Sequence, residues 1–340
     1  MMRAPGEMRD MAAAGTTRTV IGAVAKPFFL VMDRVPAECL VERYLELAIM
    51  PPMKTLYRVS CFAAMAFAFL HFLSSSAFAQ LSEPNAAGVA MGHLHYHVRD
   101  VEANKRFWVT LGGRSLRIGT VEAIKLPGVF VFLTQGESSG GTEGSSVDHV
   151  AFRVPSLAAV ASAGLRVEPV AGFPGVASTY TPEGERVELF EDAAQNLTFT
   201  QDAGYNDAAA QRHNRPVGVP VAFHHIHMYV PEIEVAKVKD WYVRLFGGIP
   251  GKRSQYDAVD LPGVNLNISG PARGTAPTRG RMLDHIGLEI RGLEAFCAKL
   301  VAMGVKLDVP YAKGTANFAT ATLTDPWGTT IELTEGLRGY

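Results

Sequence analysis

Cysteine is scarce in this 340-residue chain. Of three cysteines, Cys39 and Cys61 precede residue 80, which leaves only Cys297 in the remainder. That remainder cannot form an internal disulfide, so its stability has to come from burial of apolar side chains. Cys297 lies on an apolar helical stripe and is predicted to be a small core residue.

An excess of charge of either sign is also absent. Lys and Arg number 32 against 33 Asp and Glu, which gives a formal net charge of −1. Phosphate binding requires clustered, uncompensated cations, so we expect no nucleic-acid partner. A small-molecule substrate fits this composition better.

No uninterrupted apolar run reaches the ~20 residues that a membrane-spanning helix needs. The apolar run Cys61–Leu73 follows Lys54 and Arg58 and ends in small residues at Ala79, which is the three-part pattern of a secretory signal peptide. We therefore predict a signal peptide at 53–79, export to the periplasm or medium, and no stable membrane anchor after cleavage.

Residues 1–52 precede a segment that belongs at an N-terminus. The hypothesis is that translation starts at Met53 and that the upstream residues are a non-native extension. Residues 80–90 would then form a short N-terminal tail of the mature protein.

After this tail the sequence repeats itself in the same order. "FWVTLGG" (107–113) returns as "WYVRLFGG" (241–248), "LPGVFVFL" (126–133) as "LPGVNLNI" (261–268), "DHVAFRV" (148–154) as "DHIGLEI" (284–290), and "ERVELFE" (185–191) as "TTIELTE" (329–335). Such regular spacing predicts duplicated domains at 91–192 and 223–336. The polar segment 193–222 between them is predicted to be a linker.

Each copy divides again at a Gly-rich stretch, 136–146 in the first and 269–281 in the second. We predict flexible connectors there, because Gly and Ser favour an open chain. On both sides of each connector an alternating run with a histidine precedes a helical stretch and further short strands. Four modules of the type βαβββ are predicted.

These motifs resemble the vicinal oxygen chelate superfamily, which includes glyoxalase I, extradiol dioxygenases and bleomycin resistance proteins. The residues that carry the resemblance are the histidine in each first strand, the aromatic pair before "LGG" or "FGG", the "DH" pair, and "DPWGTTIEL" (325–333). The resemblance implies an α+β fold of tandem domains. In each, two βαβββ modules form a cup-shaped, curved mixed sheet with helices outside, around one divalent metal.

The resemblance also implies the metal ligands, two histidines and one glutamate in each copy: His93, His149 and Glu188, then His225, His285 and Glu332. If a module of one copy pairs instead with a module of the other, His93 joins His285 and Glu332, and His225 joins His149 and Glu188. Two imidazoles and a carboxylate leave open positions for substrate and O₂ or water, whereas a structural site uses four protein ligands.

The stretch "HLHYHV" places His93, His95 and His97 at alternate positions, so their rings should share one side of a strand. His95, and His227 in the second copy, are the candidate catalytic acid–base groups, with the alternative that they only line the cup. His224 is expected to point away from His225.

The remaining ligand position of the family, a glutamate in glyoxalase I, corresponds to Phe132 and Asn267. Its loss favours a dioxygenase-type enzyme with Fe2+. Against cleavage of catechols, the tyrosine position of extradiol enzymes corresponds to Ser178 and Thr322.

Two alternatives stay open. One is a lyase or isomerase of the glyoxalase or epimerase type with Zn2+, Mn2+ or Ni2+, and the other is a non-catalytic binding protein. The segment 325–333 fits the family's closing motif best, so the second copy is expected to be the active one.

Overall fold

The computed structural model describes residues 80–192, 198–215, 218–270, 276–314 and 318–340. The predicted signal peptide, 53–79, and the extension before it lie outside the described residues. Within the described part, no helix combines the length and apolar character needed to cross a membrane.

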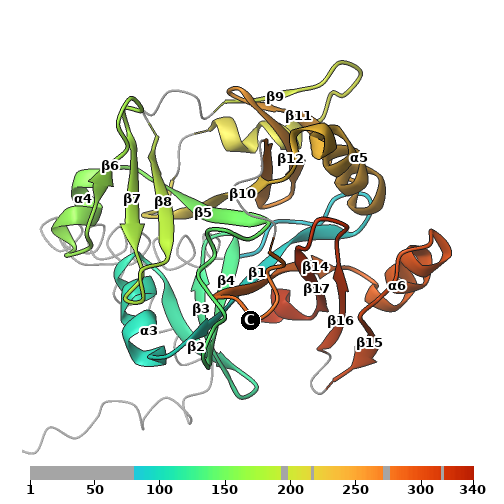
Figure 1. Cartoon of the computed structure of the whole chain (residues 1–340), viewed down its shortest axis with the longest axis horizontal. Coiled ribbons are helices and arrows are strands. Elements are labelled where there is room, and N and C mark those ends of the chain that lie inside the picture. Colours follow the sequence, from blue (N-terminus) through green and yellow to red (C-terminus); the bar gives the residue numbers. More distant parts are fainter. Residues whose placement is uncertain (1–79, 193–197, 216–217, 271–275, 315–317) are drawn as a thin grey trace, which may run out of the picture. The chain divides into compact units, whose positions relative to one another are not determined.

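The described strands form two mixed sheets (Figure 1). The eight-stranded sheet has the order β15-β16-β17-β14-β1-β4-β3-β2, and its strands are β1 (Val89–Val98), β2 (Arg114–Ile118), β3 (Val121–Leu126), β4 (Val129–Gln135), β14 (Leu283–Ile290), β15 (Val309–Lys313), β16 (Ala319–Thr324) and β17 (Thr330–Glu335). The nine-stranded sheet has the order β6-β7-β8-β5-β10-β13-β12-β11-β9, and its strands are β5 (Val147–Val154), β6 (Glu168–Pro169), β7 (Val176–Tyr180), β8 (Arg186–Glu191), β9 (Phe199–Gln201), β10 (Ala222–Tyr229), β11 (Ile249–Arg253), β12 (Tyr256–Leu261) and β13 (Val264–Ser269).

One helix follows the first strand of each βαβββ module. They are α3 (Val101–Thr110), α4 (Leu157–Ser162), α5 (Val235–Phe246) and α6 (Leu293–Ala302), with short 3₁₀ turns η2 (Ala208–Asn214), η3 (Glu232–Glu234) and η4 (Leu337–Gly339). Asp100 caps α3 by accepting from the Ala103 N–H, and Gly247 ends α5 in the left-handed conformation. The predicted α+β fold of tandem βαβββ modules is confirmed.

The modules pair crosswise between the two copies. Strand β1 of the first copy runs antiparallel to β14 of the second, and β5 of the first runs antiparallel to β10 of the second. Two equivalent hydrogen bonds tie the copies together, from Met91 N to Pro262 O at 2.7 Å and from Phe223 N to Pro127 O at 3.1 Å. Each sheet therefore contains one module of each repeat.

The largest apolar cluster contains side chains from both sheets. Trp108 of α3 and Tyr242 of α5 are both fully buried in it, and each such side chain contributes about 1.5–3 kcal/mol by leaving water. Cys297 is 3% exposed within the same cluster, which confirms its predicted core position.

The first Gly-rich connector is packed, contrary to the prediction of an open chain. Ser145 and Ser146 are 1% exposed, and Ser146 N donates to Ala276 O of the second connector at 3.1 Å. Arg281 Nε donates to Gly141 O at 2.7 Å. Each connector thus supplies the backbone partners that the other needs, a long-range effect that composition does not reveal.

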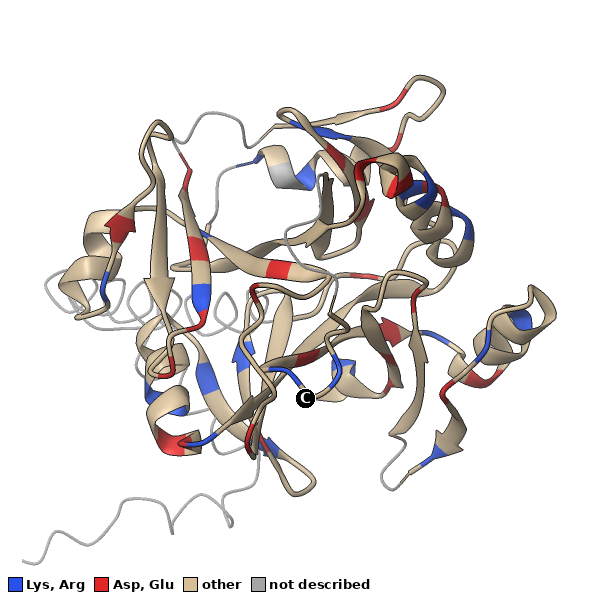
Figure 2. Ribbon diagram, in the orientation of Figure 1, with Lys and Arg blue, Asp and Glu red and all other residues tan. Residues whose placement is uncertain are grey.

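Part of the segment predicted as a linker belongs to a sheet. Strand β9 pairs antiparallel with β11 and forms the edge of the nine-stranded sheet. Lys and Arg are interspersed with Asp and Glu along the ribbon (Figure 2). The expectation that no nucleic acid binds stays a prediction.

Candidate metal centres

Two clusters of histidine and glutamate lie on the central strands of the two sheets. The β1 site consists of His93 on β1, His285 on β14 and Glu332 on β17. Glu332 Oε2 lies 3.0 Å from His93 Nε2 and 3.5 Å from His285 Nε2. The β1 site is therefore assembled from both copies.

The β10 site consists of His225 on β10, His149 on β5 and Glu188 on β8. Glu188 Oε2 lies 3.1 Å from His149 Nε2 and 3.5 Å from His225 Nε2. The structure thus brings together all six predicted ligands, in the crosswise combination. The site expected within the second copy, with His225 and His285 together, does not form, because these residues lie in different sheets.

The spacing of these atoms suits a shared cation. Two ligand atoms about 2.0–2.2 Å from one ion, at tetrahedral or octahedral angles, lie roughly 3–3.5 Å apart. Moreover, Nε2 of His93, of His225 and of His285 is buried and has no hydrogen-bond partner among the described residues, although a glutamate oxygen is near. Buried polar atoms usually have a partner, so the donor set fits a divalent metal.

A β-bulge next to each of two ligands brings an aspartate beside the imidazole. In the β5–β10 ladder the pairing skips Asp148, and in the β1–β14 ladder it skips Asp284. Asp148 Oδ1 lies 2.6 Å from His149 Nδ1, and Asp284 Oδ1 lies 2.6 Å from Nδ1 of the following histidine. Such a carboxylate fixes the tautomer and aims Nε2 at the site.

His224 corrects the prediction that it points away from His225. It is the extra residue of another bulge, between the pairs of Phe223 and His225, and it is fully buried. Its Nδ1 lies 2.7 Å from Nδ1 of His225, so one ring donates to the other. His224 therefore supports a ligand from behind.

The candidate acid–base histidines lie inside the two clusters. Nε2 of His95 lies 2.7 Å from Thr134 Oγ1, and Nε2 of His227 lies 2.8 Å from Ser269 Oγ. Each also offers a ring nitrogen within 4.8 Å of the ligand nitrogens of its site. Their positions suit either proton transfer or a third imidazole ligand. The ring centroids of His95 and His97 are 5.9 Å apart, and those of His93 and His95 6.4 Å, as expected for one face.

The pKa values of the two imidazoles in the β10 site move in opposite directions. Burial, with repulsion from His149 and His227, holds the pKa of His225 well below its usual value. Burial also lowers the pKa of His149, but the Glu188 charge and the hydrogen bond to Asp148 raise it above its usual value overall. His225 is thus neutral and able to coordinate at neutral pH.

The β1 site repeats this division. Burial outweighs the attraction of Glu332 and lowers the pKa of His93. Burial also acts to lower the pKa of His285, but the hydrogen bond to Asp284 and the nearby Glu332 carboxylate raise it above its usual value overall. Burial acts to raise the pKa of Asp284, but its hydrogen bond to His285 holds it at about 2. The pKa of Asp148 is also about 2, because its hydrogen bond to His149 outweighs the effect of burial. Both orienting aspartates therefore stay ionised at neutral pH.

The walls of the two sites differ although their ligands match. Phe132 stacks on His93 with ring centroids 4.5 Å apart, and Ile118 and Phe130 lie in the same apolar cluster. The two "LPGV" motifs begin at Leu126 and Leu261, so corresponding residues of the two copies are 135 positions apart here. The residues of the β10 site that correspond to Ile118, Phe130 and Phe132 are polar: Arg253, Asn265 and Asn267. The β1 site is packed with rings where the β10 site carries polar groups.

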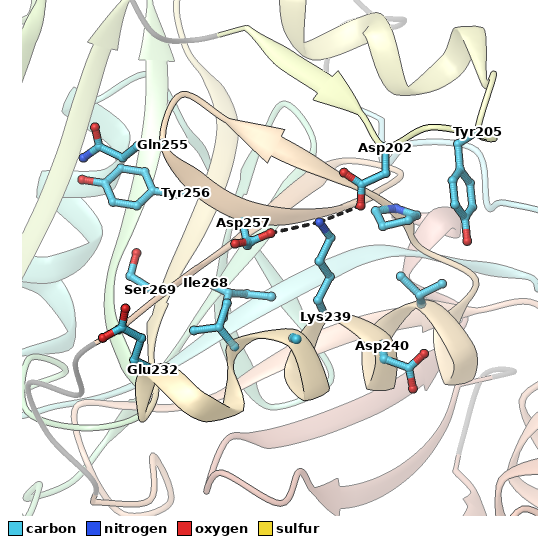
Figure 3. Close-up of a pocket in the computed structure, with 15 residues that line it drawn as sticks. Asp202, Tyr205, Glu232, Lys239, Asp240, Gln255, Tyr256, Asp257, Ile268 and Ser269 are labelled. Atoms are coloured by element: carbon cyan, nitrogen blue, oxygen red, sulfur yellow. Dashed lines mark hydrogen bonds and ion pairs between the residues drawn. The ribbon is translucent and has the colours of Figure 1, made fainter.

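A cavity of about 210 Å³ opens on the β10 site and is lined by its three ligands, His227, Arg253 and Asn267, among others. A larger cavity of about 790 Å³ lies next to it and shares Gln255 and Tyr256 (Figure 3). There Lys239 lies between Asp202 and Asp257, at 2.7 and 3.0 Å, so its charge is compensated. The smaller cavity is the one lined by the proposed metal ligands and by His227, the candidate acid–base group.

Sequence reasoning missed two kinds of residue. Asp148 and Asp284 were visible as the repeated "DH" pair, but alternation in a strand places neighbours on opposite faces and hides the bulge. Arg253 gave no signal, because an arginine at a strand end is usually solvated. The expectation that the second copy is the active one stays a prediction, and the structure divides that copy between the two sites: Glu332 belongs to the β1 site and His225 to the β10 site.

Residues 222–333 match the family model described as the Glyoxalase/Bleomycin resistance protein/Dioxygenase superfamily. Among solved structures, a glyoxalase I variant from Zea mays aligns with a TM-score of 0.50 and 15% identity, over 74% of this chain and 94% of that one. A candidate dioxygenase from Bacillus subtilis aligns with a TM-score of 0.51 and 14% identity, over 76% and 86%. At these identities the likeness establishes the fold. No curated protein matches the sequence.

Proposed function

Because residues 222–333 match the model of the glyoxalase/bleomycin resistance protein/dioxygenase superfamily, we propose that the chain is a metal-dependent enzyme of the dioxygenase type whose working centre is the β10 site. The observation that carries the proposal is the convergence of His149, His225 and Glu188, with Oε2 within 3.5 Å of both Nε2 atoms, on an accessible cavity. These three residues would hold the cation.

A bound divalent ion with Fe2+ chemistry would supply adjacent positions for two oxygens of the substrate and for O₂. The protein's own groups prepare this reaction. Asp148 keeps the His149 ring aimed at the site, and the apolar side chains of Val170, Phe173 and Val176 in the cavity wall limit water. His227, hydrogen-bonded to Ser269, holds or passes a proton.

Metal content and O₂ uptake test the proposal. We expect the protein purified without O₂ to contain iron, and O₂ uptake to follow addition of a vicinal diol such as catechol. A protein that binds no divalent metal in stoichiometric amount contradicts the proposal. Iron without O₂ uptake on a panel of vicinal diols and hydroxy acids removes the dioxygenase assignment.

A second candidate, a lyase or isomerase, is favoured by Asn267. This residue occupies the position of the missing glutamate, lines the cavity, and its Oδ1 is buried without a hydrogen-bond partner among the described residues. An amide oxygen there can act as a weak fourth ligand. Zinc, nickel or manganese in the protein, with solvent proton exchange into a hydroxy ketone and no O₂ uptake, would select this candidate.

We also propose that the enzyme is exported and that the mature chain begins at Gln80. The basic start, apolar run and small-residue end of 53–79 support this. N-terminal sequencing of the exported protein tests it, and peptides from before Met53 would contradict it.

A further inference from the structure

Arg253 is a buried cation in the wall of the β10 site. It ends β11, is 2% exposed, and lines the cavity together with Ser254 and Gln255 of the hairpin turn. Ser254 has φ = +53°, unusual for a residue other than glycine, so the tight turn holds this corner of the wall in place. The guanidinium therefore has a defined position beside the ligands.

Dedicated partners hold this charge in the wall. Arg253 Nε donates to Asn265 Oδ1 at 3.0 Å, and Asn265 Nδ2 donates to Asp260 Oδ1 at 2.8 Å. Burial lowers the pKa of Arg253 to about 9, against the attraction of Asp260, so the group is a cation at neutral pH. A fold that only needed a filled space would not require this chain of polar side chains.

The fold itself does not call for a cation there, as the β1 site shows. At the corresponding positions Ile118 replaces Arg253, Phe130 replaces Asn265 and Lys125 replaces Asp260. Ile118 and Phe130 pack in an apolar cluster, and Lys125 Nζ lies 5.5 Å from the centre of the Phe130 ring. The polar chain is therefore specific to the site with the cavity.

Electrostatics favour an anionic occupant between the arginine and the ligands. Arg253 and His225 line the same cavity, so the two groups face one occupant. The positive charge of Arg253 repels a divalent cation held by His225. An anion that contacts both removes this repulsion, and a guanidinium binds a carboxylate through two parallel hydrogen bonds.

We propose that the β10 site selects a small substrate that carries a carboxylate, which Arg253 binds while the vicinal oxygens face His149, His225 and Glu188. The cavity of about 210 Å³ limits this substrate to a compact molecule. The assignment rests on the proposed function for the role of the vicinal oxygens, but the recognition of the carboxylate by Arg253 can be measured separately.

The test is a binding titration with a matched pair of probes, a dihydroxybenzoate with vicinal hydroxyls and its neutral amide. Calorimetry is done without O₂ on the full mature protein, both loaded with divalent metal and metal-free. We expect the carboxylate to bind at least about tenfold more tightly than the amide, because a hydrogen bond to a charged group is worth that much. Metal content is measured on the same samples.

Arg253→Gln should abolish this preference, since glutamine keeps a donor for Asn265 and removes the charge. Lys252→Gln is the matched control, because Lys252 is the preceding residue, carries the same charge and is exposed. The control should keep the preference, and thermal melting shows whether each variant is folded.

Equal binding of the two probes by the wild type overturns the proposal without any variant. A preference that survives in folded Arg253→Gln also overturns it. Failure of metal binding alone, with the carboxylate preference intact in the metal-free protein, removes the proposed function and leaves the role of Arg253 standing.

Discussion

The β1 and β10 sites are two versions of one design in the same chain. Each has two imidazoles and a glutamate on central strands, a bulged aspartate behind one imidazole, and a further histidine beside the ligands. They differ in the wall, where Phe132 stacks on His93 in one and Asn267 and Arg253 line a cavity in the other. The ligand set is thus the same in both, whereas the wall is aromatic at the β1 site and carries a buried arginine and an amide at the β10 site.

The largest difference is expected from removal of one ligand in each site. His225→Ala should lower turnover by about 1000-fold or more, because a metal supplies several kcal/mol of transition-state stabilisation and each 1.4 kcal/mol is a factor of ten. His93→Ala should remove a metal ion and leave turnover within about twofold. Metal analysis and steady-state kinetics on both variants check this.

Equal loss of turnover in His93→Ala and His225→Ala would contradict the assignment of turnover to the β10 site and not to the β1 site. Thermal melting serves as the control for folding, because both histidines are buried.

Gly287→Ala should destroy the β1 site alone. A Cβ at Gly287 would lie 2.0 Å from Nδ1 of His93, so the ring has to leave its position. The β10 site has alanine at the corresponding position, Ala151, which pairs with His225 on the neighbouring strand. We expect the variant to lose one metal ion and to keep turnover, as measured by metal analysis and kinetics.

The matched control is Ala151→Gly, which opens space beside His225 without a collision and should keep both metal ions. Retention of two ions in Gly287→Ala would show that the His93 ring is not needed for metal binding.

Asp148→Asn should weaken the metal at the β10 site by about 10- to 100-fold, the usual cost of removing a group that orients a histidine ligand. The amide cannot stabilise the same tautomer of His149 as the carboxylate does at 2.6 Å. Competition with a metal-binding dye in the His93→Ala background, which leaves the β10 site as the metal site, measures this affinity.

Asp284→Asn is the equivalent change in the β1 site. It should weaken that site by a similar factor while turnover stays unchanged. A fall in turnover with Asp284→Asn but not with Asp148→Asn would reverse the roles assigned to the two sites.

The sequence was sufficient to predict the modules, whereas the ligand set was implied by the family resemblance and stays a prediction that the convergence of the six side chains supports. Alternation placed His93, His95 and His97 on one face, and repetition identified Glu188 and Glu332 as equivalents. The sequence could not decide whether modules pair within a copy or between the two copies, because both arrangements give each sheet the same pattern of apolar residues. That choice is made by long-range contacts such as those of the two "LPGV" turns.

The β-bulges and the burial of Arg253 could not be predicted from the alternation of apolar and polar residues. A bulge adds one residue to one strand, which leaves the hydrophobic alternation almost intact and reverses the side on which Asp148 or His224 lies. The burial of Arg253 on β11 depends on Asn265 of β13, which accepts its hydrogen bond and is paired with Asp260 of β12, and this arrangement of three strands is set by tertiary packing.

The smallest effect is expected from the ring that stacks on His93. In the His225→Ala background, which leaves the β1 site as the metal site, Phe132→Leu should change metal affinity by about 2- to 10-fold, since an aromatic pair is worth ~0.5–1.5 kcal/mol. Phe130→Leu is the matched control, because Phe130 is also a buried phenyl but its close ring contact is with Phe132, at 6.3 Å. Equal shifts in the two variants would mean that general packing, and not the ring against His93, sets the affinity. A larger shift in Phe132→Leu would show that the wall of the β1 site acts directly on the ligand His93, so that the wall tunes metal affinity at this site.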